Sequence, residues 1–286
     1  ASLPGSGIVY TLTVADAERL AAAVTAAHGD ELPVAAYTGQ LEAAQREQLE
    51  DDLRHNRVKA LIATSALGMG YDKPDLGFVV HLGAPASPVS YYQHIGRAGR
   101  AIDSAVVALL PAAGDENIWE YFATATIPKK EQVATLLTAL QAAAEPMSVV
   151  ALDAETGLRR NRVELLLKQL AVDGVVERTP DGWRATGVEW SFDEEHYAGV
   201  IATREREADI MRRYIAGAQC LMKLLRTALD DPEAADCGQC SVCLGHLPEP
   251  LTTDIDPATL ERIAAVLRAE TITLEPRKMW PGGAFG

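Results

Sequence analysis

The sequence predicts an α/β fold: a domain built on a parallel sheet, followed by a winged-helix domain and a helical zinc-binding module. Strand and helix patterns alternate through the first 110 residues, three helical patterns and a hairpin pattern fill residues 131–187, and four cysteines gather between residues 220 and 243. We expect the parallel-sheet domain at residues 1–127, the winged-helix domain at 128–190, the zinc-binding module at 191–250, and a C-terminal helix and tail at 251–286.

In the first domain, short apolar and β-branched runs mark strands, and apolar residues at helical spacing mark helices. The strands are expected at residues 7–12, 32–37, 58–64, 76–83 and 104–110. The helices between them are expected at residues 16–27, 41–54 and 87–100. Because strands and helices alternate, the strands should form one parallel sheet.

The second region reads as three helices and a hairpin. Helices are expected at 131–141, at 148–157 with Ser148 at its start, and at 159–171. Two short strands then flank the turn sequence Thr-Pro-Asp-Gly at 179–182. Three helices followed by a β-hairpin are typical of a winged helix-turn-helix.

The third helix of this region carries a candidate DNA-binding face. Its polar residues point away from the leucine face, and its N-terminus offers backbone N–H groups that favour phosphate. The residues concerned are Arg159, Arg160, Asn161, Arg162, Lys168 and Gln169. A solvated face on a domain used for protein contacts is the alternative, and the sequence leaves both open.

Residues 193–229 form two helical stretches divided near residue 216, and Asp256 and Pro257 begin a last helix. The stretch Asp193-Glu194-Glu195-His196 spells an Asp-Glu-x-His box. It follows no buried strand, and no phosphate loop precedes it. We therefore interpret it as an acidic helix start.

Composition excludes several classes of protein. Apolar residues make up 48% and charged residues 23%, so a disordered chain is excluded. The sequence has no long apolar run and no signal-peptide pattern, so we expect no membrane partner and a cytoplasmic, nucleoid-associated location. A net charge of −14 argues against non-specific coating of nucleic acid.

The strongest chemical signal is the segment Gln-His-Ile-Gly-Arg-Ala-Gly-Arg at residues 93–100, which we name the arginine motif. Arg97 and Arg100 are three apart at the end of the expected helix, so they should share one face. Two guanidinium groups offer paired donors to a polyphosphate. A glycine-rich segment at 63–75 follows a buried strand, and ligands bind at such carboxyl ends.

These residues resemble a known family. Residues 7–110 are similar to the second RecA-like domain of superfamily 2 helicases, and more closely to the RecQ family of DNA helicases. Four segments carry the resemblance, at 7–21, 35–47, 64–75 and 90–100. Two positions depart from it: Thr38 stands where a histidine is common, and Asp72 where the family often has asparagine.

The resemblance implies a role for each motif residue. Arg100 would be the arginine finger on the γ-phosphate with Arg97 beside it, and Gln93 would couple nucleotide to domain closure. Gly70 and Asp72 would lie at the nucleotide edge between two motor domains. Thr64 and Thr11 would contact the phosphate backbone of the tracking strand.

The second strong pattern is Cys220-x16-Cys237-x2-Cys240-x2-Cys243. Four thiolates at this spacing suit a tetrahedral structural Zn²⁺, with Cys220 on a helix and the others in one loop. The spacing, with residues 205–220, resembles the RecQ zinc-binding module. In that family the zinc module usually follows the motor directly, whereas here the winged-helix pattern lies between them. Either the subfamily is rearranged or the winged-helix interpretation is wrong.

The sequence as a whole indicates the C-terminal half of a RecQ-like, ATP-dependent 3′-to-5′ DNA helicase, the polarity being implied by the family. No lysine follows a glycine, so the chain has no phosphate loop. It should not hydrolyse ATP alone and should need the first motor domain, ATP and Mg²⁺. The expected partner is DNA, single-stranded or as a tailed or forked duplex. The alternatives are an RNA helicase of the same superfamily and a non-catalytic module that docks partner proteins.

Overall fold

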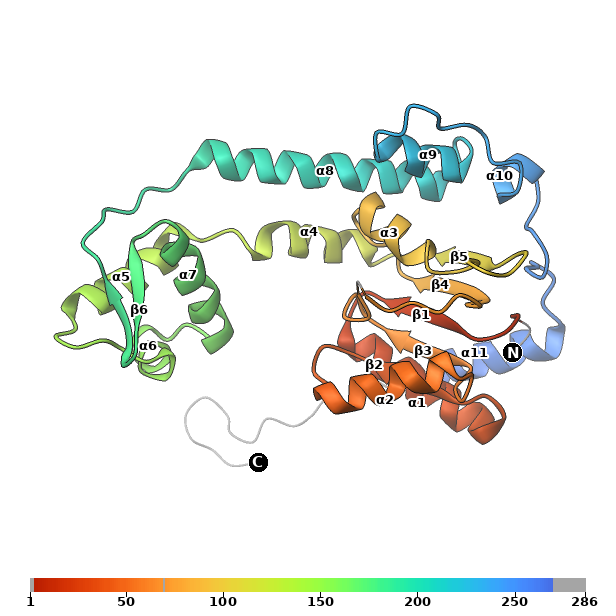
Figure 1. The fold of residues 1–286 in the computed structure, drawn as a ribbon, viewed down its shortest axis with the longest axis horizontal. Helices are drawn as coiled ribbons and strands as arrows, with labels where there is room; N and C mark the ends of the chain where they lie inside the picture. The colour runs from red at the N-terminus through yellow and green to blue at the C-terminus, as the bar shows by residue number, and fades with distance from the viewer. Residues whose placement is uncertain (1–2, 69, 270–286) are drawn as a thin grey trace.

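The computed structural model describes residues 3–68 and 70–269 (Figure 1). A five-stranded sheet has the order β2-β3-β1-β4-β5, and all its neighbouring strands pair in parallel. Its strands are β1 Gly7–Thr11, β2 Val34–Tyr37, β3 Ala60–Ala63, β4 Phe78–Leu82 and β5 Val106–Leu110. Each lies within its expected range, so the parallel-sheet prediction is confirmed.

Helices α1 Val14–His28, α2 Ala43–Arg54 and α3 Pro88–Ile95 connect the strands, with a short 3₁₀ turn at Gly29–Glu31. The sheet core is apolar on both faces, and Ile8, Leu61 and Val79 are fully buried. The β1–α1 connection places Thr13 as the N-cap of α1, where its hydroxyl accepts a hydrogen bond from the backbone N–H of Asp16. Because β1, β3 and β4 run in parallel, the loops that follow them lie at one edge of the sheet.

The expected helix over residues 87–100 ends early, and this corrects the predicted arginine face. α3 stops at Ile95, Gly96 is its C-cap, and Gly99 adopts a φ of +73°. A positive φ is readily available to glycine and ends helical geometry. Arg97 and Arg100 consequently lie in the turns after the helix, where Arg97 is buried and Arg100 is exposed.

Residues 130–185 form a separate helix–hairpin lobe with its own core. It contains α5 Lys130–Ala142, α6 Val149–Thr156, α7 Arg160–Val172, and an antiparallel pair, β6 Val176–Thr179 and β7 Gly182–Ala185. Its buried residues include Val133, Leu152 and Leu166, none of which is exposed. The three expected helices and the hairpin are present, and the winged-helix assignment itself stays a prediction.

A helix that the sequence analysis missed, α4 Asp115–Ala125, leads from the sheet to the lobe, and α8 Glu194–Ala216 returns beside it (Figure 1). α9 Leu221–Ala228, α10 Ser241–Leu244 and α11 Pro257–Ala269 follow. Met211, Tyr214 and Leu225 belong to the same apolar cluster as the sheet residues. The helices of the expected zinc-binding module thus pack directly on the first domain.

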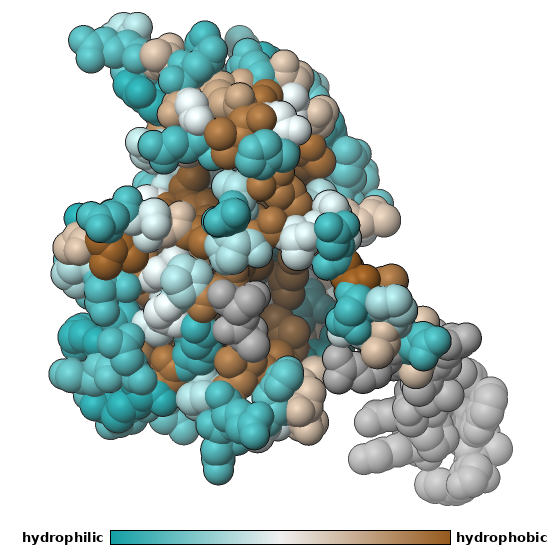
Figure 2. Space-filling model, turned by 90° about the vertical axis from the view of Figure 1, so that its right-hand side faces the viewer, coloured by the Kyte–Doolittle hydropathy of each residue, from teal (hydrophilic) through white to brown (hydrophobic). Residues whose placement is uncertain are grey.

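The face that carries α10 has a polar rim and an apolar middle. Figure 2 shows hydrophilic side chains around its edge and hydrophobic ones in the hollowed centre. Leu251, beyond α10, packs against the cluster of sheet residues that contains Phe78 and Val106. Among the described residues, no helix combines the length and apolarity that a membrane span requires.

Candidate nucleotide and metal sites

Residues of the arginine motif and of the glycine-rich segment at 63–75 meet around one hollow of about 480 Å³. One side is the loop after β3, and the other is the end of α3. The lining residues are Gly70, Tyr71, Asp72, Tyr92, Gln93, Gly96, Arg97 and Arg100. The five residues assigned to nucleotide chemistry from sequence therefore lie together, although 21 residues separate Asp72 from Gln93.

Arg100 presents its guanidinium at the mouth of this hollow. Its Nη1 donates to Asp72 Oδ1 at 2.8 Å, and its Nε donates to the Gly96 carbonyl at 3.0 Å. Both partners of the ion pair are about half exposed. Exposed ion pairs contribute at most about 1 kcal/mol, so an incoming anion can displace Asp72 from Arg100.

Arg97 has a different role from the one the sequence suggested, because its side chain turns inward. The residue is 8% exposed, and its Nη1 donates to the Tyr71 carbonyl at 2.9 Å. Burial raises the pKa of Tyr10 to about 12, while the nearby positive charge of Arg97 opposes that shift. Arg97 thus ties the arginine motif to the loop after β3, and it does not stand beside Arg100 at the surface.

His94 of the arginine motif belongs to a buried stack that the sequence analysis missed. Its ring stacks on Tyr10 with centroids 4.0 Å apart, and its Nδ1 lies 3.1 Å from Nε2 of His81. Burial lowers the pKa of His81 to about 3 and that of His94 to about 4. Both imidazoles are neutral at physiological pH, so they act through packing.

This neutrality predicts an acid-sensitive fold. Between about pH 6.5 and pH 4 the unfolded chain holds protons on these histidines that the folded chain does not, so the free energy of unfolding must fall as the pH drops through that window. Each histidine held neutral contributes a slope of about 1.4 kcal/mol per pH unit. Urea denaturation at pH 7, 6 and 5 should show this slope, and His94→Gln should make it shallower. An unchanged slope in that variant would contradict the assignment.

The two threonines expected on a nucleic-acid strand are neighbours at the ends of β1 and β3. Tyr10 pairs with Ala63, which brings the following residues, Thr11 and Thr64, side by side. Thr11 is 6% exposed and its hydroxyl donates to the Thr13 carbonyl at 3.0 Å. Only Thr64 is partly exposed, so Thr11 is a structural residue here.

The four cysteines converge as their spacing predicts. Their Sγ atoms all lie within 4.8 Å of one another, and those of Cys220 and Cys240 are 4.0 Å apart. Zn–S bonds of about 2.3 Å in a tetrahedron place sulfurs just under 4 Å apart, so the donor set fits zinc. Cys220 precedes α9 as its N-cap, and Cys243 lies in α10, which corrects the expected helix and loop positions.

Backbone N–H groups surround these sulfurs. The amides of Cys237 and Lys223 point at Cys220 Sγ, at 3.2 Å and 3.5 Å. Burial disfavours a thiolate at Cys240, but backbone donors and the neighbouring thiols outweigh it and lower the pKa of Cys240 to about 6, while burial and the same neighbouring sulfurs raise the pKa of Cys243 to about 12. Thiolates are the form that binds metal, and four sulfurs within 4.8 Å of one another supply the donor set that a cation would require.

The polar face of α7 is only partly free. Arg159, Arg160 and Lys168 are exposed, and Arg160 pairs with Glu164 at 3.1 Å. Arg162 instead donates to Gln132 Oε1 and to the carbonyls of Ala125 and Ile127 at 2.7–2.9 Å. Gln169 donates to the Thr126 carbonyl at 2.6 Å. Arg162 and Gln169 therefore cap the end of α4. The guanidinium of Arg162 is occupied within the protein, so Arg162 is not a DNA-contact residue in this structure.

Arg162 should accordingly matter for stability. We expect Arg162→Ala to lower the free energy of unfolding by about 2–3 kcal/mol, because it leaves helix-end carbonyls without their charged donor. Arg160→Ala, on the same helix but exposed, should cost less than about 0.5 kcal/mol. Urea denaturation compares the two variants, and equal losses would contradict the capping role.

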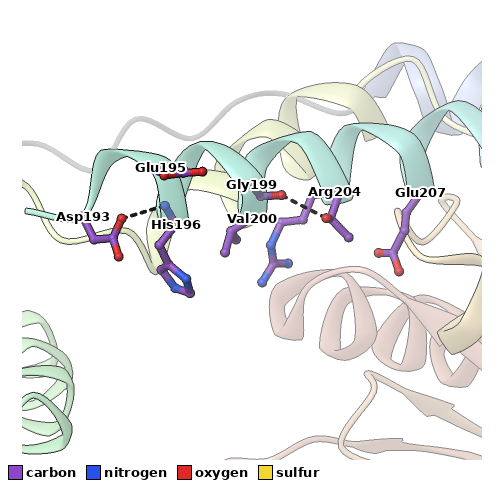
Figure 3. A pocket seen from close by; sticks show the side chains of 8 residues that line it. Asp193, Glu195, His196, Gly199, Val200, Arg204 and Glu207 are labelled. Carbon is purple, nitrogen blue, oxygen red and sulfur yellow. Dashed lines mark hydrogen bonds between the residues drawn. The ribbon is translucent and has the colours of Figure 1, made fainter.

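The acidic stretch at residues 193–196 is a helix cap. Asp193 Oδ1 accepts a hydrogen bond from the backbone N–H of His196 at 2.8 Å (Figure 3). A hollow of about 770 Å³ runs along this part of α8, and every residue that lines it comes from that one helix and its cap. The interpretation of Asp193-Glu194-Glu195-His196 as a helix start is confirmed.

Known proteins resemble this chain most clearly over the parallel-sheet domain, which carries the arginine motif. Residues 2–102 match the family model described as the helicase conserved C-terminal domain. The chain is 33% identical over 140 residues to the probable ATP-dependent DNA helicase RecS of Bacillus subtilis, covering 49% of this chain and 28% of that protein. It is 40% identical over 95 residues to the ATP-dependent DNA helicase RecQ of Pasteurella multocida, covering 33% of this chain and 15% of that one.

A longer match includes the lobe and the cysteines. The chain is 26% identical over 270 residues to the ATP-dependent DNA helicase RecQ of Synechocystis, covering 85% of this chain and 50% of that protein. The chain thus spans half or less of the length of these relatives. Residues 2–102 thus match a helicase conserved C-terminal domain, and the chain is similar to RecQ- and RecS-type ATP-dependent DNA helicases.

Proposed function

We propose that this chain is the C-terminal half of an ATP-dependent, 3′-to-5′ DNA helicase. The observation that carries the proposal is the hollow at which Gly70, Asp72, Gln93 and Arg100 meet. It lies on the strand-end edge of a parallel sheet and presents one exposed guanidinium to an anion. The relatives described above are ATP-dependent DNA helicases and suggest the reaction, which would require the first motor domain.

In this proposal Arg100 acts as the arginine finger. A guanidinium on the transferred phosphoryl group stabilises the charge that develops in the transition state. Asp72 holds Arg100 until nucleotide is bound, and the buried Arg97 fixes the turn from which Arg100 projects. Gln93, exposed at the end of α3, would sense the nucleotide across the same hollow.

The four-cysteine cluster would hold a structural Zn²⁺. The ion would join the start of α9 to the loop at residues 237–243 and would supply cross-linking but no chemistry. Since residues of α9 and of the end of α8 belong to the apolar core of the sheet domain, such a cross-link would stiffen the part of that domain on which these two helices pack.

Duplex contact would come from the helix–hairpin lobe through Arg159, Arg160 and Lys168. The test is fluorescence anisotropy with a 3′-tailed DNA duplex across a salt series, beside an RNA copy. We expect Arg159→Ala with Arg160→Ala to weaken binding about tenfold and to flatten the slope of log K against log salt by about 1.8, for two phosphate contacts.

A matched control removes the same charge elsewhere. Arg19→Ala with Arg57→Ala, both exposed on the sheet domain, should leave affinity and slope unchanged. No difference between the two double variants would favour the alternative in which the lobe docks a partner protein. Equal affinity for the RNA copy would favour an RNA helicase.

A further inference from the structure

Five aromatic rings form a continuous series of edge-to-face and stacked contacts from the end of α8 to the arginine motif and β1. They are Tyr214 on α8, Tyr91 and His94 on α3, His81 on β4, and Tyr10 on β1. The ring centroids of Tyr214 and Tyr91 are 5.0 Å apart, and those of Tyr91 and His81 are 4.8 Å apart. The ring of His81 lies 5.3 Å from that of His94, which lies 4.0 Å from that of Tyr10. We call these residues the ring stack.

Four of the five rings are closed to solvent, and His94 is partly buried. Tyr10, His81 and Tyr91 are at most 2% exposed, and Tyr214 is 7% exposed. Two polar contacts fix its order: the hydroxyls of Tyr91 and Tyr214 are 3.2 Å apart, and the imidazoles of His81 and His94 meet at 3.1 Å. Close-packed interiors transmit displacement because no void absorbs it, so one ring cannot shift without its neighbours.

Each end of the ring stack lies near residues of one of the proposed sites. At one end, Tyr10 lies near the positive charge of Arg97, which is three residues before Arg100 in the arginine motif. At the other end, Tyr214 lies in the last turn of α8, six residues before Cys220. The α9 helix that begins after Cys220 also packs on α3, and Leu224 and Leu225 are buried in the shared core.

We propose that the ring stack positions the arginine motif, so that the end of α8 and the four-cysteine cluster beyond it hold Arg100 in register with the nucleotide hollow. Tyr214 and Tyr91 are then positioning residues that act through His94 and Arg97. The part of this inference that concerns nucleotide rests on the proposed function. The mechanical part concerns only residues that the structure brings into contact.

Hydrogen exchange measures the mechanical part directly. The backbone N–H groups of Gly96, Arg97 and Ala98 donate to carbonyls of α3, and that of Gly99 donates to the Leu76 carbonyl, so their exchange rates report how firmly the arginine motif is held. In the full 286-residue chain, Tyr214→Ala should raise these rates about tenfold or more. Tyr214→Phe, which keeps the ring and loses the hydroxyl contact, should raise them about two- to tenfold.

Two controls separate positioning from general loss of stability. Tyr197→Ala alters the other tyrosine of α8, which stacks on Phe192 far from α3, and should leave the motif amides unchanged. Amides of β2 and β3 serve as the internal reference, because a purely structural defect would speed them in parallel. Motif rates that rise no more than the β2 and β3 rates in Tyr214→Ala would overturn the proposal.

The metal provides a second, independent perturbation. Chelation of a zinc-loaded chain should speed exchange at Gly96–Gly99 in the wild-type sequence, and it should add little in Tyr214→Ala, where the connection is already broken. Equal effects of chelation in both chains would overturn the link to the cysteines. If the exchange results hold while Arg100→Ala leaves ATP hydrolysis unchanged in the longer protein, the proposed function fails and the ring stack remains a positioning element.

Discussion

Replacing Arg100 with alanine in a protein that also carries the first motor domain should lower the rate of ATP hydrolysis by about 10³-fold or more. Removal of an arginine finger has costs of about 10³–10⁵ in phosphoryl transfer. In this chain Arg100 is the arginine exposed at the mouth of the hollow, since Arg97 is buried against Tyr71 and Tyr10. The loss should appear in kcat, because a finger contacts charge that develops only in the transition state.

Three variants make this test specific. Arg100→Lys keeps the charge but loses the planar fork, so it should remain well below the wild-type rate. Asp72→Asn removes the carboxylate that pairs with Arg100 and should lower KM for ATP by about two- to fivefold, in line with the small worth of an exposed pair. Arg19→Ala, on the outer helix α1, is the matched control. Hydrolysis that survives in Arg100→Ala would refute the finger assignment.

The sheet was predictable because its sequence signals are local. The buried strand Ala60–Ala63 reads as a continuous apolar run, and amphipathic spacing marks α2 between it and β2. Parallel order then follows from alternation. The same reasoning applied to the cysteines, since two gaps of two residues already place three thiolates within reach of one ion.

The directions of the two arginines were not predictable in this way. Spacing alone put Arg97 and Arg100 on one helix face, but the helix ends at its C-cap, Gly96, before both arginines, and the side chain of Arg97 turns into the core. Whether an arginine turns inward depends on acceptors far away in sequence. The Tyr71 carbonyl accepts from Arg97, and the carbonyls of Ala125 and Ile127 accept from Arg162.

Contacts between distant segments were the other gap. Tyr91 and Tyr214 are 123 residues apart, and neither stands out in a sequence where each resembles an ordinary core tyrosine. Helix α4 was missed because its exposed Tyr121 and Phe122 blur the apolar periodicity that identifies amphipathic helices. The Tyr91–Tyr214 contact and the position of α4 both depend on the tertiary packing of α8 along α4 and against α3.

Loss of one cysteine ligand should have the largest effect on stability. We expect the chain to contain one zinc per molecule, and Cys240→Ser to abolish stoichiometric binding and lower the melting temperature by about 10 °C or more. Cys240 is chosen because its Sγ lies 4.0 Å from Cys220 Sγ and also accepts the backbone N–H of Leu221, so it joins the loop to α9. The measurements are metal analysis and calorimetry of the same samples.

The nearest suitable control is His246, an exposed histidine just beyond α10 that points at the Leu247 carbonyl. His246→Ser should leave both zinc content and melting temperature unchanged, because four sulfurs already complete a tetrahedral shell. Zinc that is retained in Cys240→Ser but lost in His246→Ser would replace the four-cysteine assignment with a mixed site. If Cys240→Ser loses the metal without losing stability, α8 and α9 must be held by the apolar core around Met211 and Leu225 alone. In that case the cysteines would not brace the arginine motif.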